Sequence, residues 1–177
     1  MINKDIIEKE LKKITNKKIK VKVNSNKKRG VYSWVRRIEF NGSIDFDLTE
    51  LDGVLAHEIV HIEEKHVIKL FSLILSGIII AIISYIFLPL IIKINIFYIL
   101  SFILTVLIIS VIILSRRFER IADKKAAEKV GKVPIIRALE KIGTLEEMRK
   151  YDLVHDKLRK RIDNIKKLDL PDFIELK

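Results

Sequence analysis

The chain has 177 residues, 49% of them hydrophobic and 32% charged, with a formal net charge of +11 and no cysteine. This length suits one domain with a membrane insert better than two full domains, and the lack of cysteine excludes disulfide scaffolds, thiolate metal sites and cysteine nucleophiles. The lysines are dispersed over both ends without interleaved aromatic residues, so no nucleic-acid partner is expected.

An amphipathic helix is predicted over residues 2–14, where isoleucine and leucine recur at helical spacing among lysine and glutamate. We expect this helix to pack on a core, and attachment to a membrane surface is the lesser alternative. Residues 1–20 alternate apolar and charged positions, so they do not resemble a signal peptide, which has a basic end followed by an apolar core.

A small antiparallel sheet is expected next. Residues 18–23 alternate lysine with β-branched residues, which is the period of a half-buried strand. Residues 31–40 resume with β-branched and aromatic side chains. The polar residues 24–30 predict the first turn, and the Asn-Gly pair at 41–42 predicts a hairpin into a short strand at 44–46.

The following helix carries the sequence H-E-x-x-H, and Thr49 with Asp52 has the spacing of its N-terminal capping box. Residues four apart lie on one helix face, so His57 and His61 can present two imidazoles to one tetrahedral ion. Glu58 lies on the adjacent strip, within reach of a water that zinc acidifies and a carboxylate deprotonates. Two histidines spaced by accident are the alternative, because the pentapeptide alone often occurs by chance.

Two uncharged runs follow, at residues 70–92 and 94–115, separated by Lys93. Each exceeds the roughly 18 apolar residues that indicate a transmembrane helix, and a buried core helix is the alternative. No glycine or proline separates the H-E-x-x-H segment from the first run, so the metal-motif helix is expected to continue from His66 into the bilayer. Positive residues crowd the outer ends of this hairpin, which predicts that both chain termini and the metal site face the cytoplasm. These residues are Lys65, Lys69, Arg116, Arg117 and Arg120.

The remainder of the chain is predicted to be helical. A polar helix is expected over residues 116–131, because its final glycine suits a C-terminal cap. Another helix should begin near Pro134 and end at Gly143. Apolar residues at helical spacing predict a last amphipathic helix over residues 156–168.

A catalytic zinc site needs a third protein ligand. The metzincin pattern would place glycine at position 64 and histidine at 67, where this chain has Glu64 and Val67. His66 is one residue off that register and is expected on the wrong helix face. Glu63 and Glu64 continue along the same helix, so they are interpreted as a solvated acidic face. The third ligand must therefore come from another helix.

Glu119 fits this requirement, because the membrane hairpin returns its helix to the side of His57. Asp123 lies one turn later and faces the same way, where it suits the second N–H of a ligand imidazole. Taken alone, both acids are more typical of a solvated surface among basic neighbours. The residues around them change that interpretation.

The segment E-R-I-A-D-K-K-A-A at 119–127 resembles the E-x-x-A-D-x-x-A-A signature of the membrane gluzincins typified by HtpX and the CAAX prenyl proteases. The sequence L-A-H-E that ends at Glu58 resembles another motif of this family, and the resemblance covers about residues 31–168 in order. It implies a zinc metalloendopeptidase that binds one Zn²⁺ per chain. It also implies that Glu119 is the third ligand beside His57 and His61, with Asp123 as its neighbour.

The C-terminal region resembles the family's H-P-x-x-x-x-R-I element through His155 and Arg161, although Asp156 replaces the proline. The resemblance implies that His155 or Arg161 stabilises the oxyanion or positions the substrate. Tyr151 is a weaker candidate for this role. A helix-capping histidine and a solvated arginine are the alternative.

Together these patterns predict an α+β fold in which a small antiparallel sheet lies against zincin active-site helices, with a two-helix transmembrane hairpin inserted between the two metal motifs. Residues 1–66 and 116–177 would form the metallopeptidase domain and residues 67–115 the hairpin. The expected function is a membrane-anchored zinc endopeptidase with Glu58 as general base. Its partners would be the lipid bilayer and a polypeptide substrate, with unfolded and membrane proteins as candidates, bound along an edge strand at residues 36–40. A catalytically silent zinc-binding membrane protein and a membrane-anchored interaction module are the competing hypotheses.

Overall fold

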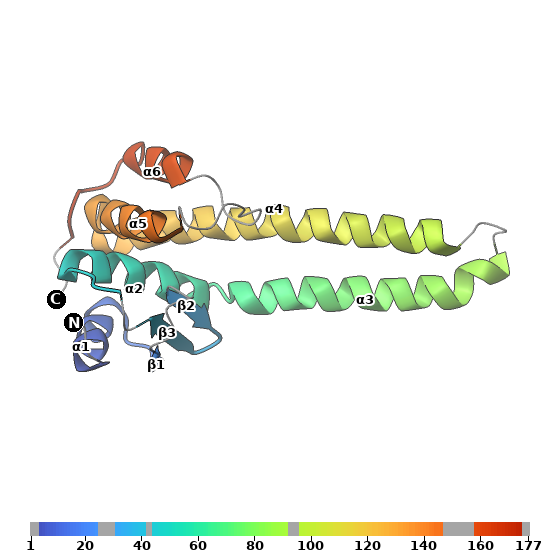
Figure 1. Cartoon of the computed structure of the whole chain (residues 1–177), viewed down its shortest axis with the longest axis horizontal. Coiled ribbons are helices and arrows are strands. Elements are labelled where there is room, and N and C mark those ends of the chain that lie inside the picture. The colour runs from blue at the N-terminus through green and yellow to red at the C-terminus, as the bar shows by residue number, and fades with distance from the viewer. Residues whose placement is uncertain (1–3, 25–30, 42–43, 92–95, 147–157, 175–177) are drawn as a thin grey trace.

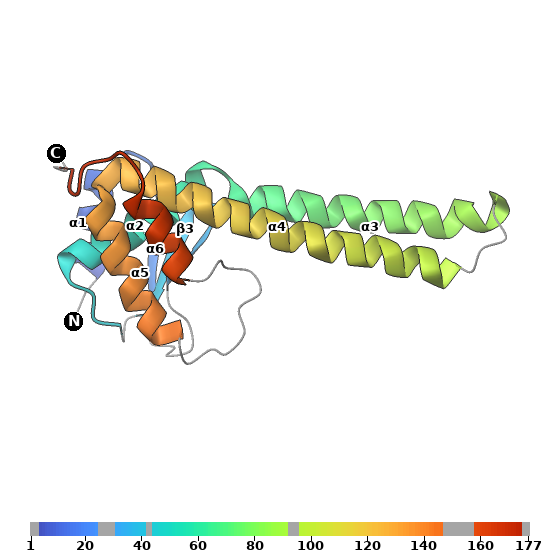
Figure 2. The ribbon, with the colours of Figure 1, turned by 90° about the horizontal axis from the view of Figure 1, so that it is seen from above.

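The computed structural model describes residues 4–24, 31–41, 44–91, 96–146 and 158–174, and it consists of a head and a long helical arm (Figure 1). The arm is made of α3 (His66–Ile91) and the first part of α4 (Ile96–Val130), which run side by side away from the head in two perpendicular views (Figures 1 and 2). The elements in chain order are α1 (Lys4–Ile14), β1 (Lys20–Asn24), β2 (Val31–Trp34), β3 (Arg37–Asn41), α2 (Leu48–Glu63), α3 (His66–Ile91), α4 (Ile96–Val130), α5 (Lys132–Glu146) and α6 (Leu158–Lys166).

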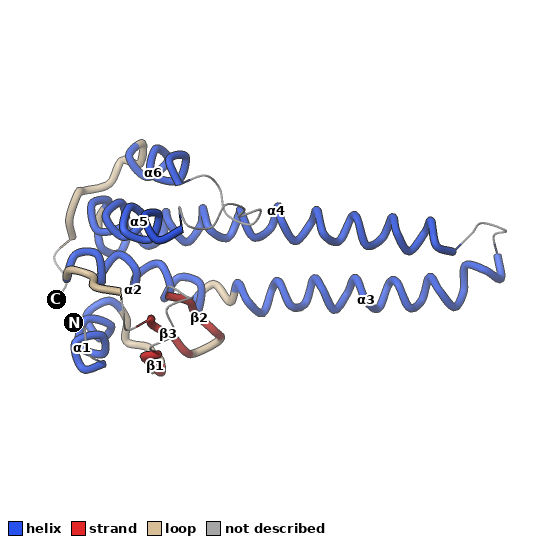
Figure 3. Tube along the Cα trace, viewed as in Figure 1, coloured by secondary structure: helices blue, strands red, loops and turns tan. Residues whose placement is uncertain are grey.

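The sheet has three strands in the order β1-β3-β2, which Figure 3 draws in red. It is mixed rather than antiparallel. The expected single strand at residues 31–40 is divided by a turn at Val35 and Arg36, so that β2 and β3 form an antiparallel hairpin. β3 then pairs with β1 in parallel, with Val21 opposite Ile38. The prediction of an antiparallel sheet was therefore wrong, because the hairpin turn lies earlier in the chain than expected.

No strand forms at the expected position 44–46, and Gly42 of the predicted hairpin lies outside the described residues. Phe46 is buried instead, and its ring contacts that of Phe40 edge-on, with 6.5 Å between the centroids. The next residue, Asp47, already caps a helix. The segment therefore passes directly from the core of the sheet into α2.

The N-cap of α2 is Asp47, two residues before the Thr49 predicted for it. The Glu50 amide donates a hydrogen bond to Asp47 Oδ1 at 2.7 Å, and the Asp47 amide donates one to Glu50 Oε2 at 2.9 Å. These reciprocal bonds form a capping box, so the prediction from Thr49 and Asp52 was wrong. Glutamate three residues after the cap is long enough to reach back to the cap amide, which favours this earlier start.

A sharp break separates α2 from α3, contrary to the expected continuous helix. Lys65 has a φ of 55°, and its amide bonds to the Ile62 carbonyl at 3.2 Å. A left-handed residue of this kind ends a helix. The direction of α3 is thus set independently of α2, and His66 is the first residue of α3.

Two hydrophobic clusters form the core of the head, and α2 contributes to both. The first joins α2 to α1, the sheet and α5, and the second joins α2 to α4, α5 and α6. α2 is therefore the central helix of the fold. Its fully buried residues include Leu51, Leu55, Ala56, Ile59 and Val60.

The arm consists of two helices that are long and apolar enough to cross a membrane. Their most apolar windows are 0% buried, so among the described residues the alternative of a buried core helix does not apply. The two helices approach closely at Gly77, where an added Cβ atom would lie 2.8 Å from the side chain of Leu107. Small residues commonly permit such approaches between membrane helices.

α4 continues without interruption from the apolar arm into the head. The polar helix predicted to begin at residue 116 is thus the second half of α4, and it ends before Gly131 as expected, with a φ of 92° at that glycine. Gly143 does not end α5, which runs to Glu146. The missing side chain of Gly143 instead leaves room for Leu158 of α6.

Candidate metal centre

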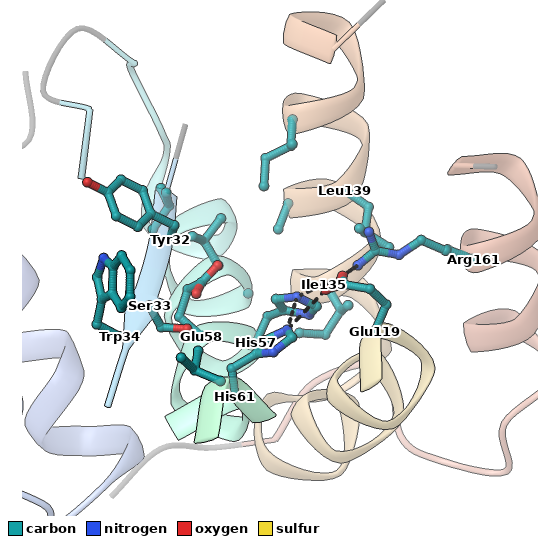
Figure 4. Close-up of a pocket in the computed structure, with 16 residues that line it drawn as sticks. Tyr32, Ser33, Trp34, His57, Glu58, His61, Glu119, Ile135, Leu139 and Arg161 are labelled. Atoms are coloured by element: carbon teal, nitrogen blue, oxygen red, sulfur yellow. Dashed lines mark hydrogen bonds and ion pairs between the residues drawn. The ribbon is translucent and has the colours of Figure 1, made fainter. Parts of the chain in front are cut away.

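Two elements that are distant in sequence bring His57, His61 and Glu119 together. α2 supplies the two histidines and α4 supplies the glutamate, and one ligand atom from each lies within 4.8 Å of the other two (Figure 4). The Nε2 atoms of the histidines are 3.0 Å apart. Glu119 lies 3.4 Å from each of these nitrogen atoms, through Oε2 to His57 and Oε1 to His61.

These separations fit a tetrahedral ion. Zinc binds nitrogen and oxygen at about 2.0–2.2 Å, so two ligands of a tetrahedral site are about 3.3 Å apart. The observed separations of 3.0–3.4 Å match that value without rearrangement of the backbone. Two imidazoles and one carboxylate are also one of the donor sets found in catalytic zinc sites. The group could therefore hold a metal ion.

Acidic and basic side chains surround this group. Asp123 Oδ1 lies 3.0 Å from His57 Nδ1, on the side of the ring away from the ligand nitrogen. Arg161 of α6 donates two hydrogen bonds to Asp123, from Nε at 2.8 Å and from Nη2 at 2.7 Å. Its Nη2 atom also lies 3.2 Å from Glu119 Oε2. The side chain of Arg161 thus joins α6 to Glu119 and Asp123 of α4.

The two histidines differ in their electrostatic environment. Burial lowers the pKa of His57, but the carboxylates of Asp123 and Glu119 outweigh this effect and raise the pKa to about 10. Burial, with the neighbouring His57, lowers the pKa of His61 to about 4. The two carboxylates therefore favour positive charge beside His57, which is the electrostatic condition for holding a cation.

Glu58 faces an open cleft beside the metal group. Figure 4 shows its side chain between His57 and strand β2. Burial raises the pKa of Glu58, and a hydrogen bond to Ser33 of β2 acts in the opposite direction. The cleft has a volume of about 540 Å³, with Ser33 and Trp34 of β2 on one wall and Ile135 and Leu139 of α5 on the other.

β2 is the strand that borders this cleft, and it lies at one edge of the sheet. The strand expected to be a free edge, at residues 36–40, is instead mostly β3, which is hydrogen-bonded on both sides. That expectation was wrong, because strand order is determined by long-range pairing that the local sequence pattern does not record.

The other predicted site residues fall in different places. His155 and Tyr151 lie outside the described residues. His66, expected on the wrong face, lies beside the group, with its Nδ1 atom 3.0 Å from Nδ1 of His61. Helical spacing alone did not predict this contact between His66 and His61, because the contact depends on the left-handed backbone of Lys65.

The sequence model of peptidase family M48 matches residues 27–169, which is well over half of the chain. The match contains both the H-E-x-x-H segment of α2 and the acidic segment of α4. Comparison with curated proteins and with solved structures gave no match.

Proposed function

Since this chain belongs to peptidase family M48, we propose that it is a zinc-dependent endopeptidase of the HtpX-like type, anchored in a membrane by α3 and α4. The observation that carries the proposal is the convergence of His57, His61 and Glu119 at separations suited to one tetrahedral ion. In this proposal the two segments at residues 1–66 and 116–177 form one metallopeptidase domain, and residues 67–115 form the membrane hairpin.

His57, His61 and Glu119 would hold the zinc ion. Bound zinc lowers the pKa of a water molecule to about 7 and polarises the scissile carbonyl. Glu58 would take the proton from the attacking water and later deliver it to the leaving amine. Burial raises the pKa of Glu58, which favours uptake of a proton by this carboxylate.

Asp123 and Arg161 would keep this group in position. A carboxylate that accepts the second N–H of a ligand imidazole fixes the orientation of that ring, and Asp123 lies at the required distance from His57. The guanidinium of Arg161 lies against Asp123 and Glu119, which favours a positioning role. His155 and Arg161 remain the candidates for stabilising the oxyanion.

The substrate would bind as an extended segment along β2. An edge strand presents unpaired backbone groups to which a peptide can add, and β2 borders the cleft that contains Glu58. The apolar wall from α5 would accommodate hydrophobic side chains of an unfolded polypeptide or membrane protein. The basic residues at the outer ends of the arm favour a cytoplasmic head.

The experiment is cleavage of an unfolded test protein by the full chain purified in detergent, compared with Glu58→Gln. The wild type should contain one zinc per chain and cleave, and a chelator should abolish cleavage. Glu58→Gln should keep its zinc but cleave about 10²- to 10⁴-fold more slowly. Normal cleavage by that variant would refute the mechanism. Stoichiometric zinc without cleavage by the wild type would instead favour the catalytically silent zinc protein.

A further inference from the structure

We propose that His66 is a positioning residue of the metal centre, which accepts the Nδ1 hydrogen of His61 and so directs the Nε2 atom of His61 toward the ion. The proposal rests on the metal-binding role given above to His57, His61 and Glu119. His66 lies outside the H-E-x-x-H motif, at the first position of α3.

The chain break before α3 creates this contact. Each residue of an α-helix advances by about 100°, so five residues of unbroken helix would turn His66 about 140° away from His61. Lys65, with a φ of 55°, reverses the chain between them. As a result, the Nδ1 atoms of His61 and His66 lie 3.0 Å apart. The ring of His66 is buried, with 3% of the residue exposed.

The proton positions on the two rings follow from this distance. Two nitrogen atoms 3.0 Å apart require one hydrogen between them, so one atom must donate and the other must accept. If Nε2 of His61 binds a metal, the hydrogen of that neutral ring must sit on Nδ1. His66 is therefore the acceptor at Nδ1 and carries its own hydrogen on Nε2.

Each ligand histidine then has its own partner behind the ring. Asp123 lies 3.0 Å from Nδ1 of His57, and His66 lies at the same distance from Nδ1 of His61. The first partner is a carboxylate, whereas the second is a neutral imidazole. His66 thus orients its ligand without adding a second negative charge beside Glu119.

Contacts with α4 hold the ring of His66 in place. It stacks on Phe118, with 4.2 Å between the centroids and 9° between the planes. Phe118 directly precedes Glu119, so His66 contacts one ligand of the metal group and the chain neighbour of another. This arrangement couples the relative position of α2 and α4 to the orientation of His61.

A role in packing alone does not account for a histidine here. Its Nε2 atom is buried and has no hydrogen-bond partner among the described residues. A buried polar atom without a partner is unfavourable, and an apolar ring of similar size would avoid that penalty. The contact between His66 Nδ1 and His61 supplies a reason for the imidazole.

The test compares His66→Phe with His66→Asn in the full chain purified in detergent. Phenylalanine keeps a ring for Phe118 but removes the acceptor, whereas the carbonyl oxygen of asparagine can occupy the position of Nδ1. Zinc affinity, measured by competition with a chelator, should fall about 10- to 100-fold in His66→Phe and recover largely in His66→Asn. The absorption spectrum of the Co²⁺-substituted protein should change in the first variant and return in the second.

Zinc affinity of His66→Phe within about threefold of the wild type would overturn the proposal, and so would an asparagine variant as weak as the phenylalanine variant. If His66→Phe does not fold, nitrogen NMR of the zinc-loaded wild type decides the question. A hydrogen on Nε2 of His66 supports the proposal, and one on Nδ1 overturns it. A wild type that binds no zinc would refute both the proposed function and the role of His66. A wild type that binds zinc, with a His66→Phe variant of equal affinity, would refute only the role of His66.

Discussion

Arg161 offers a sharp test of how the metal centre is held together. Its guanidinium is buried against Asp123 and Glu119, with three contacts between 2.7 and 3.2 Å. The substitution Arg161→Met keeps much of the apolar stem and removes the charge. Breaking a buried ion pair by removing one partner costs about 3–5 kcal/mol, because the remaining carboxylates lose their counter-charge.

That loss should be visible in thermal unfolding. For a chain of this length, 1 kcal/mol shifts the melting temperature by roughly 2–4 °C, so Arg161→Met should melt about 6–20 °C lower than the wild type. Its zinc affinity should also fall, by about 10- to 100-fold, since Glu119 and Asp123 lose the contact that orients them. Both quantities can be measured on protein purified in detergent, by a melting curve and by chelator competition.

The exposed Arg159 lies on the same helix and provides the matched control. Arg159→Met should leave the melting temperature and the zinc affinity close to those of the wild type. If Arg161→Met behaved like this control in both measurements, the inference that α6 stabilises the metal centre through Arg161 would be wrong.

Three further predictions concern other parts of the chain. Glu119→Ala should lower zinc affinity by more than roughly 100-fold, which is the upper cost of losing a residue that only contacts a metal ligand. Glu128 is an exposed acid of α4, and Glu128→Ala should leave zinc affinity unchanged. Burial and the neighbouring Glu10 raise the pKa of Asp52 to about 6, so the stability that its protonated form contributes is complete below about pH 4 and is lost as the pH rises through 6. Asp52→Asn should therefore melt higher than the wild type at pH 7 but equally at pH 4, and equal melting at both would contradict the assignment. In the cysteine-free chain, Lys93→Cys should react with a membrane-impermeant thiol reagent added to intact cells, whereas a cysteine at position 177 should not; the reverse result would place the head outside the cytoplasm.

Local patterns predicted the features that depend on neighbouring residues. His57 and His61 share a helix face because four residues complete about one turn, and the structure places their Nε2 atoms 3.0 Å apart. The glycine at 131 ends α4 as expected from its conformational freedom. The third proposed metal ligand, Glu119 of α4, could not be predicted from helical periodicity alone. It was identified because the segment around it resembles a known motif.

Features that depend on long-range packing were not predictable in the same way. The sequence contains a strand pattern at residues 18–23 and another at 31–40, but nothing in either pattern specifies that β3 lies between β1 and β2. The break at Lys65 is also unmarked, because lysine has no preference for positive φ. Consequently, the contact of His66 with His61 emerged only from the folded chain.

Because α4 is continuous, it fixes the distance between the metal site and the apolar run of the same helix. Arg116 is the first charged residue after the apolar run, and Glu119 follows Ser115 by four residues, or about 6 Å of helical rise. In a chain anchored as we propose, the metal would thus sit within the layer of lipid headgroups, which extends about 5–8 Å beyond the hydrocarbon on each side. A polypeptide embedded in the membrane would need only about two extended residues beyond the hydrocarbon layer to reach the metal. A folded domain would first have to unfold locally, so that one of its strands could reach the bilayer surface.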